Sequence, residues 1–177
     1  AAGRQLPVPL IIGTNDYEAS LMKSFGISAD DVLARLPPSA KPFYPGHDPA
    51  TAATLFTDSV MGAPARWIAA QASQDAPAYL YQFSYVPTVR RGKVPGAQHG
   101  GEIPFVFGSW PAIFDKFASP QDRAMETLMH ACWVSFARTG KPVCGDKAWP
   151  AYAPGSEALM EFGEKSGPVA DFRKPQY

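Results

Sequence analysis

The chain has 177 residues, 46% of them hydrophobic, which is ordinary for a globular protein and long enough for one sizeable core. Lys and Arg together number 16, as do Asp and Glu, so the formal net charge is zero. No basic excess exists to hold a phosphate backbone or an anionic membrane, and no apolar run approaches a membrane-spanning length. We therefore expect one domain over residues 1–177, with neither nucleic acid nor a membrane as partner.

The first predicted element is a strand over residues 6–13. Its short apolar run contains β-branched residues and ends at Gly13, which is typical of a strand buried in a parallel sheet. Asp16 and Glu18 follow at once, and in open α/β sheets catalytic groups collect beyond the carboxyl ends of strands. Ordinary roles are also open: Asp16 as a helix N-cap and Glu18 as a first-turn acid.

Short helices and a proline-rich loop are expected next. The patterns predict helices at 26–36, 51–56 and 64–73, the last with Trp67 and Ile68 on its apolar side. Between the first two helices lies an ordered loop. An aromatic-rich strand over residues 76–85 follows.

His99 lies among small residues just after this second strand. Gly96, Gly100 and Gly101 have no Cβ, so the backbone there can adopt positive φ or pass close to another group. An imidazole titrates near neutral pH and can accept and return a proton within one reaction cycle. The pattern favours a general base, and the ordinary alternative is a loop histidine bonded to backbone.

The clearest helix is predicted at 121–139, where apolar residues recur every three or four positions before Gly140. A strand near 159–162 is expected to form an edge hairpin with the last residues. Cys132 and Cys144 make no CxxC pair, and a disulfide between them is left open. A metal site at His99 and Glu102 would need further ligands nearby, and the sequence offers none, so no metal is expected.

The order of these groups along the chain is informative. In α/β-hydrolases the triad runs Ser, then Asp or Glu, then His. The acid fixes the imidazole tautomer, and the histidine takes the serine proton and returns it to the leaving group. Glu18 and His99 fit the last two places. The sequence contains no Gly-x-Ser-x-Gly, so this chain alone cannot be a triad enzyme.

Two segments resemble a known family. Residues 9–18, Pro-Leu-Ile-Ile-Gly-Thr-Asn-Asp-Tyr-Glu, are similar to the Gly-x-Asn-x-x-Glu-Gly segment of type-B carboxylesterases, the group of cholinesterases and bacterial p-nitrobenzyl esterases. Residues 96–108 resemble the catalytic-histidine motif of that family, and a long matching tail follows. The resemblance implies an α/β fold: the C-terminal portion of an α/β-hydrolase, a mostly parallel sheet flanked by helices, incomplete without an N-terminal part.

The resemblance also implies roles for single residues. Glu18 would be the triad acid, His99 the triad base, and Glu102 a second acid holding a hydrogen-bond network to water. Asp16 would be a cap or surface acid. Ala19 replaces the glycine usual in the family, and it would be strained if that position needs positive φ.

The implied reaction is hydrolysis of a small-molecule carboxylic ester through an acyl-enzyme, without a cofactor. The serine would come from an N-terminal fragment of the same enzyme. Phe105, Phe107 and Trp110 are expected either to line a substrate pocket or to be plain core. The alternative function is a non-catalytic, esterase-like interaction domain. The sequence indicates neither the specificity nor the cellular location.

Overall fold

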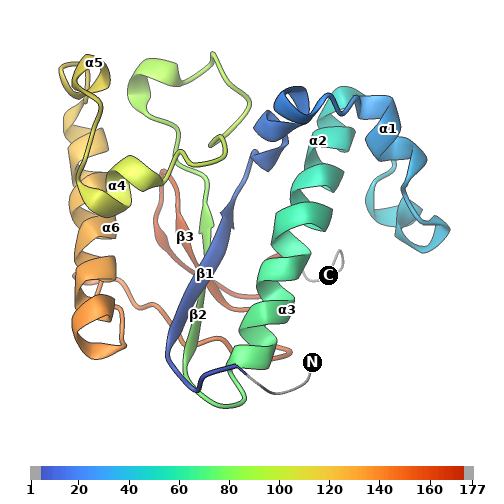
Figure 1. Ribbon diagram of the computed structural model, residues 1–177. Helices are drawn as coiled ribbons and strands as arrows, with labels where there is room; N and C mark the ends of the chain where they lie inside the picture. Colours follow the sequence, from blue (N-terminus) through green and yellow to red (C-terminus); the bar gives the residue numbers. More distant parts are fainter. Residues whose placement is uncertain (1–4, 174–177) are drawn as a thin grey trace.

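The computed structural model describes residues 5–173, which form a four-stranded sheet with helices on both faces (Figure 1). The strands are β1 (Leu10–Asn15), β2 (Ala78–Phe83), β3 (Leu159–Phe162) and β4 (Gly167–Val169), adjacent in that order. β1 with β2 and β2 with β3 are parallel, whereas β3 and β4 form an antiparallel hairpin. The predicted α/β class and the C-terminal edge hairpin are confirmed.

Helical segments connect the strands. Before β2 come η1 (Glu18–Phe25), α1 (Ala29–Ala34), η2 (Pro38–Phe43), α2 (Pro49–Thr57), η3 (Asp58–Gly62) and α3 (Ala63–Ala72). After β2 come η4 (Thr88–Arg90), α4 (Ile103–Phe107), α5 (Ala112–Asp115) and α6 (Pro120–Thr139). Within residues 5–173, none of these helices is both long enough and apolar enough to cross a membrane.

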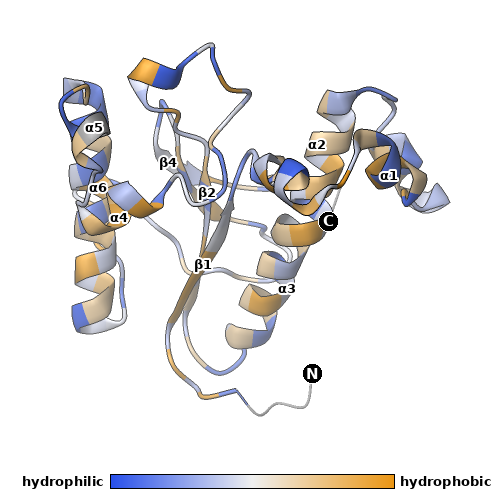
Figure 2. Cartoon of the chain, turned by 45° about the horizontal axis from the view of Figure 1, so that its top comes forward, coloured by the Kyte–Doolittle hydropathy of each residue, from blue (hydrophilic) through white to orange (hydrophobic). Residues whose placement is uncertain are grey.

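Side chains of β2 alternate between the two helix layers, as the two-residue period of a strand requires. Tyr79 and Phe83 belong to the core cluster that includes α6, while Ala78 and Leu80 belong to the cluster that includes α3. Figure 2 shows apolar residues on the helices of both layers. The central strand is therefore buried on both faces, which is the environment that parallel sheets need.

β1 covers Leu10–Asn15 rather than the predicted residues 6–13, so it begins later and extends beyond its predicted end. Gly13 does not stop the strand but lies within it, opposite Tyr81 of β2. A Cβ on residue 13 would lie 2.3 Å from the Tyr81 carbonyl oxygen and 2.4 Å from its ring, so glycine is required by this close approach. The strand continues to Asn15 and carries that residue to the edge of the sheet.

The two helices predicted at 51–56 and 64–73 are one continuous helical segment. A π-helical turn, η3, joins α2 to α3 without a break. The apolar side predicted for residues 64–73 was Trp67, Ile68 and residues 70–72, and it was wrong in part. Trp67 and Ile68 are 57% and 40% exposed, whereas Ala65, Ala69, Ala70 and Ala72 pack toward the sheet. The small alanine side chains let α3 approach the strands closely.

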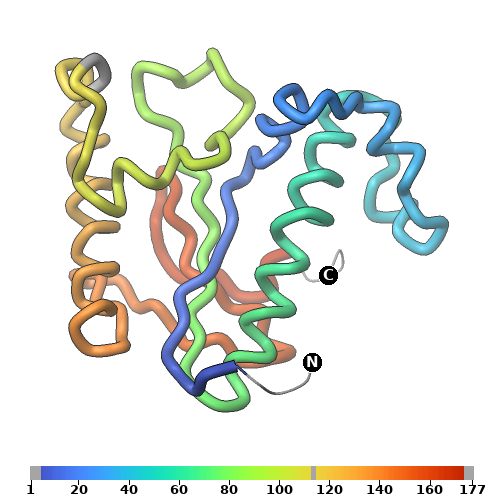
Figure 3. The backbone as a smooth tube through the Cα atoms, viewed as in Figure 1, coloured from blue at the N-terminus to red at the C-terminus, as the bar shows by residue number. Residues whose placement is uncertain are grey.

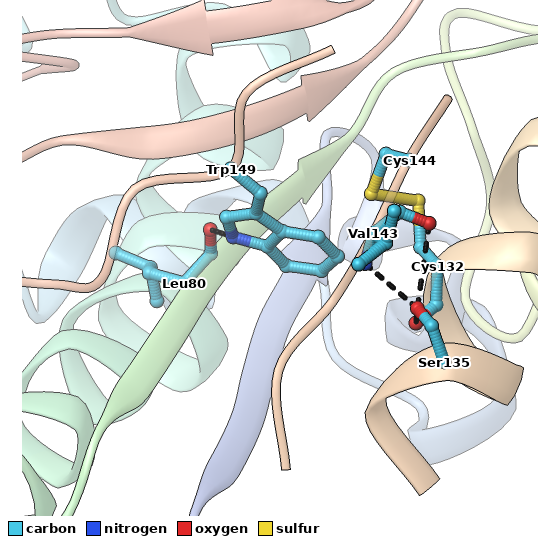
Figure 4. The surroundings of a disulfide bond; sticks show 6 residues. All are labelled: Leu80, Cys132, Ser135, Val143, Cys144 and Trp149. Carbon is cyan, nitrogen blue, oxygen red and sulfur yellow. Dashed lines mark hydrogen bonds between the residues drawn. A yellow bond between two sulfur atoms is a disulfide. The ribbon is translucent and has the colours of Figure 1, made fainter. Parts of the chain in front are cut away.

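Cys132 and Cys144 form a disulfide, which the sequence left open. Both residues are buried, and the bond ties α6 to the segment that follows it (Figure 4). The same segment is held at Ser135, whose hydroxyl oxygen accepts the backbone N–H of Val143 at 2.7 Å. Trp149 then donates its indole N–H to the carbonyl of Leu80 in β2 at 3.0 Å.

Candidate active site

The turn after β1 and the loop after β2 meet at one edge of the sheet. Parallel pairing of Asn15 with Phe83 brings the carboxyl ends of both strands together. The backbone N–H of Tyr17 donates to the carbonyl of Ala97 at 3.1 Å. Figure 3 shows the blue turn and the yellow-green loop side by side at the top of the sheet. Catalytic groups of open α/β sheets collect at this edge.

Glu18 and His99 are in direct contact. Glu18 Oε2 lies 2.6 Å from His99 Nδ1, and Glu18 Oε1 accepts the backbone N–H of Asn15 at 2.8 Å and the hydroxyl of Thr14 at 3.1 Å. The Glu18 side chain is 6% exposed and that of His99 46% exposed. Both carboxylate oxygens of Glu18 therefore have hydrogen-bond partners in a buried position. The exposed part of the His99 imidazole can contact a group from outside this cluster.

Asp16 is not a helix cap. The N-cap of η1 is Tyr17, which makes no side-chain capping bond. Asp16 Oδ1 instead accepts the backbone N–H of Ala97 at 2.6 Å, across to the histidine loop. The residue as a whole is exposed, but its carboxyl group packs against Gly96. Desolvation there raises the pKa of Asp16 to about 6, against the lowering effect of the Ala97 N–H.

Glu102 lies on the other side of Asn15. Its Oε2 accepts the Asn15 side-chain N–H at 2.6 Å, so the second acid is joined to the first through one residue of β1. Burial raises the pKa of Tyr81 well above its usual range, and the charges of Glu102 and Glu18 act in the same direction. Three carboxylates, those of Asp16, Glu18 and Glu102, and one imidazole therefore share this edge of the sheet.

The strain expected at Ala19 does not occur. Among the described residues, the non-glycine positions with positive φ are Glu157, Asp171 and Arg173. Ala19 lies in η1 and is 5% exposed, packed in the core cluster next to the turn. Its methyl group is accommodated without a left-handed backbone.

The three aromatic residues near the histidine have different surroundings. Phe105 and Trp110 line a cavity of about 160 Å³ whose wall also includes Ala97 and Gln98 of the histidine loop. Their rings pack edge to face with centroids 4.8 Å apart. Phe107 lies on α4, is 69% exposed and does not line this cavity. Phe105 is fully buried and so serves as core and cavity wall at once.

The other histidines lie away from this cluster. His47 is exposed in a loop, and His130 is exposed on α6, where its Nδ1 lies 2.9 Å from the carbonyl oxygen of Val106. Across residues 5–173, no group of three or more His, Cys, Asp or Glu side chains is arranged to hold a metal ion.

Sequence reasoning missed Thr14, Asn15 and Ser20, all of which bond to the acid or to the histidine loop. Polar residues at the end of an apolar strand, here Thr14 and Asn15, were a usable signal, but that signal applied equally to the acids that follow them.

A buried carboxylate at Nδ1 of a partly exposed imidazole is an arrangement that general acid–base chemistry can use. The fold is that of the α/β-hydrolases: a solved carboxylesterase of Geobacillus stearothermophilus superposes with a TM-score of 0.75 at 27% identity, covering 95% of this chain and 39% of that one. A solved PNB esterase gives a TM-score of 0.75 at 23% identity, over 95% and 37% of the two chains.

The chain belongs to the carboxylesterase family, whose model matches residues 45–177. It is 34% identical over 176 residues to fumonisin B1 esterase of Sphingopyxis macrogoltabida, covering 92% of this chain and 30% of that protein. It is 31% identical over 101 residues to para-nitrobenzyl esterase of Bacillus subtilis, covering 55% and 20% of the two. The chain therefore spans about a third or less of the length of these relatives.

Proposed function

We propose that Glu18 and His99 are the acid and the base of a Ser-His-Glu triad that hydrolyses carboxylic esters. The serine would lie in an N-terminal region outside these 177 residues. The observation that carries the proposal is the 2.6 Å contact between Glu18 Oε2 and His99 Nδ1. Because Nδ1 is occupied by the carboxylate, Nε2 is the nitrogen available to a serine hydroxyl.

The reaction then follows from this geometry. His99 Nε2 takes the proton of the serine hydroxyl as its oxygen attacks the acyl carbon, and gives that proton to the departing alcohol. In the second step His99 takes a proton from a water molecule as the water oxygen attacks the acyl carbon, and gives that proton to the serine oxygen as the acyl–serine bond breaks. Glu18 holds the tautomer with a proton on Nδ1 and stabilises the imidazolium that forms in each step.

Exposed surface supports a missing N-terminal region. Within the described residues β1 is an edge strand, paired with β2 alone. Beside it Leu6 and Val8 are 77% and 57% exposed. Isolated domains avoid unpaired strand edges and clustered apolar surface. A preceding region that extended the sheet beyond β1 would cover both.

The relatives support a carboxylic ester as the substrate class but do not indicate which ester this protein hydrolyses. The names fumonisin B1 esterase and para-nitrobenzyl esterase refer to different esters. What these reactions share is attack on a carboxylic ester, and this is the substrate class that we propose.

The test uses the full-length polypeptide that contains this chain, with p-nitrophenyl butyrate as substrate. His99→Ala should lower kcat by about 10,000-fold or more, since triad members act as a unit. His47→Ala, an exposed loop histidine, is the matched control and should keep full turnover. Turnover that survives in His99→Ala would remove this residue from the mechanism.

A second measurement locates the nucleophile. Diethyl p-nitrophenyl phosphate should modify one serine, found by peptide mass analysis, in the region before residue 1. A labelled serine within residues 1–177 would overturn the proposal. A protein that neither turns over the ester nor reacts with the phosphate would instead be the non-catalytic interaction domain.

A further inference from the structure

The backbone of the histidine loop is held, residue by residue, by the turn that carries the acid. Asp16 Oδ1 accepts from Ala97 N at 2.6 Å, and Asn15 Nδ2 donates to the carbonyl of Gln98 at 2.8 Å. Ser20 Oγ accepts from the backbone N–H of His99 itself at 3.0 Å. Three consecutive loop residues are therefore anchored to residues 15–20.

Asn15 has a central position among these anchors. Its side-chain NH₂ has two protons, and they serve two acceptors, the carbonyl of Gln98 and Oε2 of Glu102. Its backbone N–H donates to Oε1 of Glu18. Asn15 is 1% exposed, so these bonds are shielded from competing water. One residue thus contacts both acids and the peptide group before His99.

Ser20 holds the backbone of His99 itself. It lies in η1, two residues after Glu18, and its hydroxyl oxygen meets the amide of the residue whose ring meets Glu18. His99 is thereby bonded to η1 twice, once through its backbone and once through its side chain. Two bonds to one rigid segment fix the direction of the ring, whereas a single bond leaves rotation about it.

Backbone bonds hold the rest of the loop: Tyr17 N–H donates to the carbonyl of Ala97, and Gly101 N–H donates to the carbonyl of Gln98. Residues 99–102 form turns, Gln98 forms an isolated bridge with Tyr17, and the His99 side chain is 46% exposed. A catalytic group must be held within about 0.5 Å and 10–20° of its productive geometry. Packing does not supply this for a half-exposed ring, so hydrogen bonds to a rigid neighbour have to do so.

We propose that Asn15 and Ser20 are positioning residues for His99, which bind its loop to the acid-bearing turn and so set the direction of the imidazole toward the serine. This inference rests on the triad function proposed above. It predicts that both residues affect the chemical step rather than substrate binding.

The experiment measures steady-state kinetics of the full-length protein with p-nitrophenyl butyrate. Asn15→Asp keeps the volume but replaces both donors by acceptors facing Glu102 and Gln98, and kcat should fall about 100-fold. Ser20→Ala should lower kcat about tenfold, and both variants should keep KM within about twofold. Ser20→Ala changes a half-buried position, so it decides the question if Asn15→Asp fails to fold.

Ser135→Ala is the matched control. Ser135 also accepts a loop backbone N–H, that of Val143 at 2.7 Å, but it lies on α6 beside the disulfide. Its removal should leave kcat within about twofold of the wild type. An equal loss of kcat in Ser135→Ala and Ser20→Ala would mean that general destabilisation, not positioning, explains the effect.

Proton NMR gives a readout independent of turnover. The Nδ1 proton shared by His99 and Glu18 should give a downfield resonance, assigned by its absence in His99→Ala. Ser20→Ala and Asn15→Asp should shift or broaden it, and Ser135→Ala should not. An unchanged resonance together with unchanged kcat would overturn the positioning role. Lack of turnover in the wild type would refute the triad function alone, and the resonance would still test the anchors.

Discussion

The carboxylate of Asp16 lies against the place that a side chain at Gly96 would occupy: a Cβ there would be 2.6 Å from Asp16 Oδ1. The same oxygen accepts the N–H of Ala97. The histidine loop can approach the acid-bearing turn this closely only because residue 96 has no side chain.

Gly96→Ala should therefore move the histidine loop. The added methyl group would also come within 3.1 Å of Tyr17 Cβ, so the loop must shift by several tenths of an ångström or more. We expect kcat for ester hydrolysis to fall at least about tenfold. Gly167→Ala is the control, because a Cβ at residue 167 meets no atom within 4 Å. Equal kinetics for both variants would contradict the close approach.

Substitution of the two acids of the turn should separate their roles. Glu18→Gln removes the charge that stabilises the imidazolium, and kcat should fall by about 1,000-fold or more. Asp16→Asn retains an oxygen that accepts the Ala97 N–H, so kcat should fall by less than about tenfold. Steady-state kinetics of both full-length variants measure this difference. If Asp16→Asn were the more damaging change, the triad acid would be Asp16.

Asp122 should make stability depend on pH in the acid range. Burial alone would raise its pKa, but hydrogen bonds from Ser119 and Thr88 outweigh burial and lower the pKa to about 2. The unfolded chain then binds the proton more readily than the folded one. The stabilisation by Asp122 is complete above about pH 4 and is lost as the pH falls through about 2.

Asp122→Asn should remove this pH dependence and lower the free energy of unfolding by about 1–3 kcal/mol at neutral pH. Urea unfolding between about pH 3 and pH 7 provides the measurement. Asp31→Asn is the control, since Asp31 forms the same capping box with Ser28 on the exposed helix α1. This substitution should lower the free energy of unfolding by less than Asp122→Asn does. If the difference in the free energy of unfolding between the wild type and Asp122→Asn grew toward low pH, the prediction would be wrong.

The disulfide between Cys132 and Cys144 should stabilise the folded chain. The two residues are 12 positions apart. Closing a loop of this length lowers the conformational entropy of the unfolded chain and so raises its free energy by about 3 kcal/mol. Replacing both cysteines by alanine should lower the free energy of unfolding by that amount in urea titrations. The variant should not respond to reductant, whereas the wild type should. Equal midpoints for the wild type with and without reductant would refute the contribution of the bond.

Several features were predictable because their causes are local. α6 was visible in its apolar repeat and ends at Gly140, which has a left-handed φ of 73°. Helix α1 was predicted over residues 26–36 and covers Ala29–Ala34; it begins after Ser28, which forms a capping box with Asp31. The location of Glu18 and His99 beyond the carboxyl ends of β1 and β2 was predictable, because each apolar run is followed by polar residues.

Other features were not predictable because their causes lie far away in the chain. Gly13 looked like the end of a strand, yet the reason for glycine is Tyr81 on the neighbouring strand. Trp67 looked like a core residue but is exposed, since the small residues of α3 face the sheet. A local pattern shows that a face is apolar but not which surface covers it.

The amino-acid order alone determined which kinds of groups stand at the ends of β1 and β2, because strand periodicity and polar termini are written within a few neighbouring residues. Only the folded arrangement decided that Ser20 bonds to His99 and Asn15 to Glu102, pairs separated by 79 and 87 positions. Their meeting depends on the register of β1 against β2, and register is set by packing of the whole sheet rather than by any short stretch of chain.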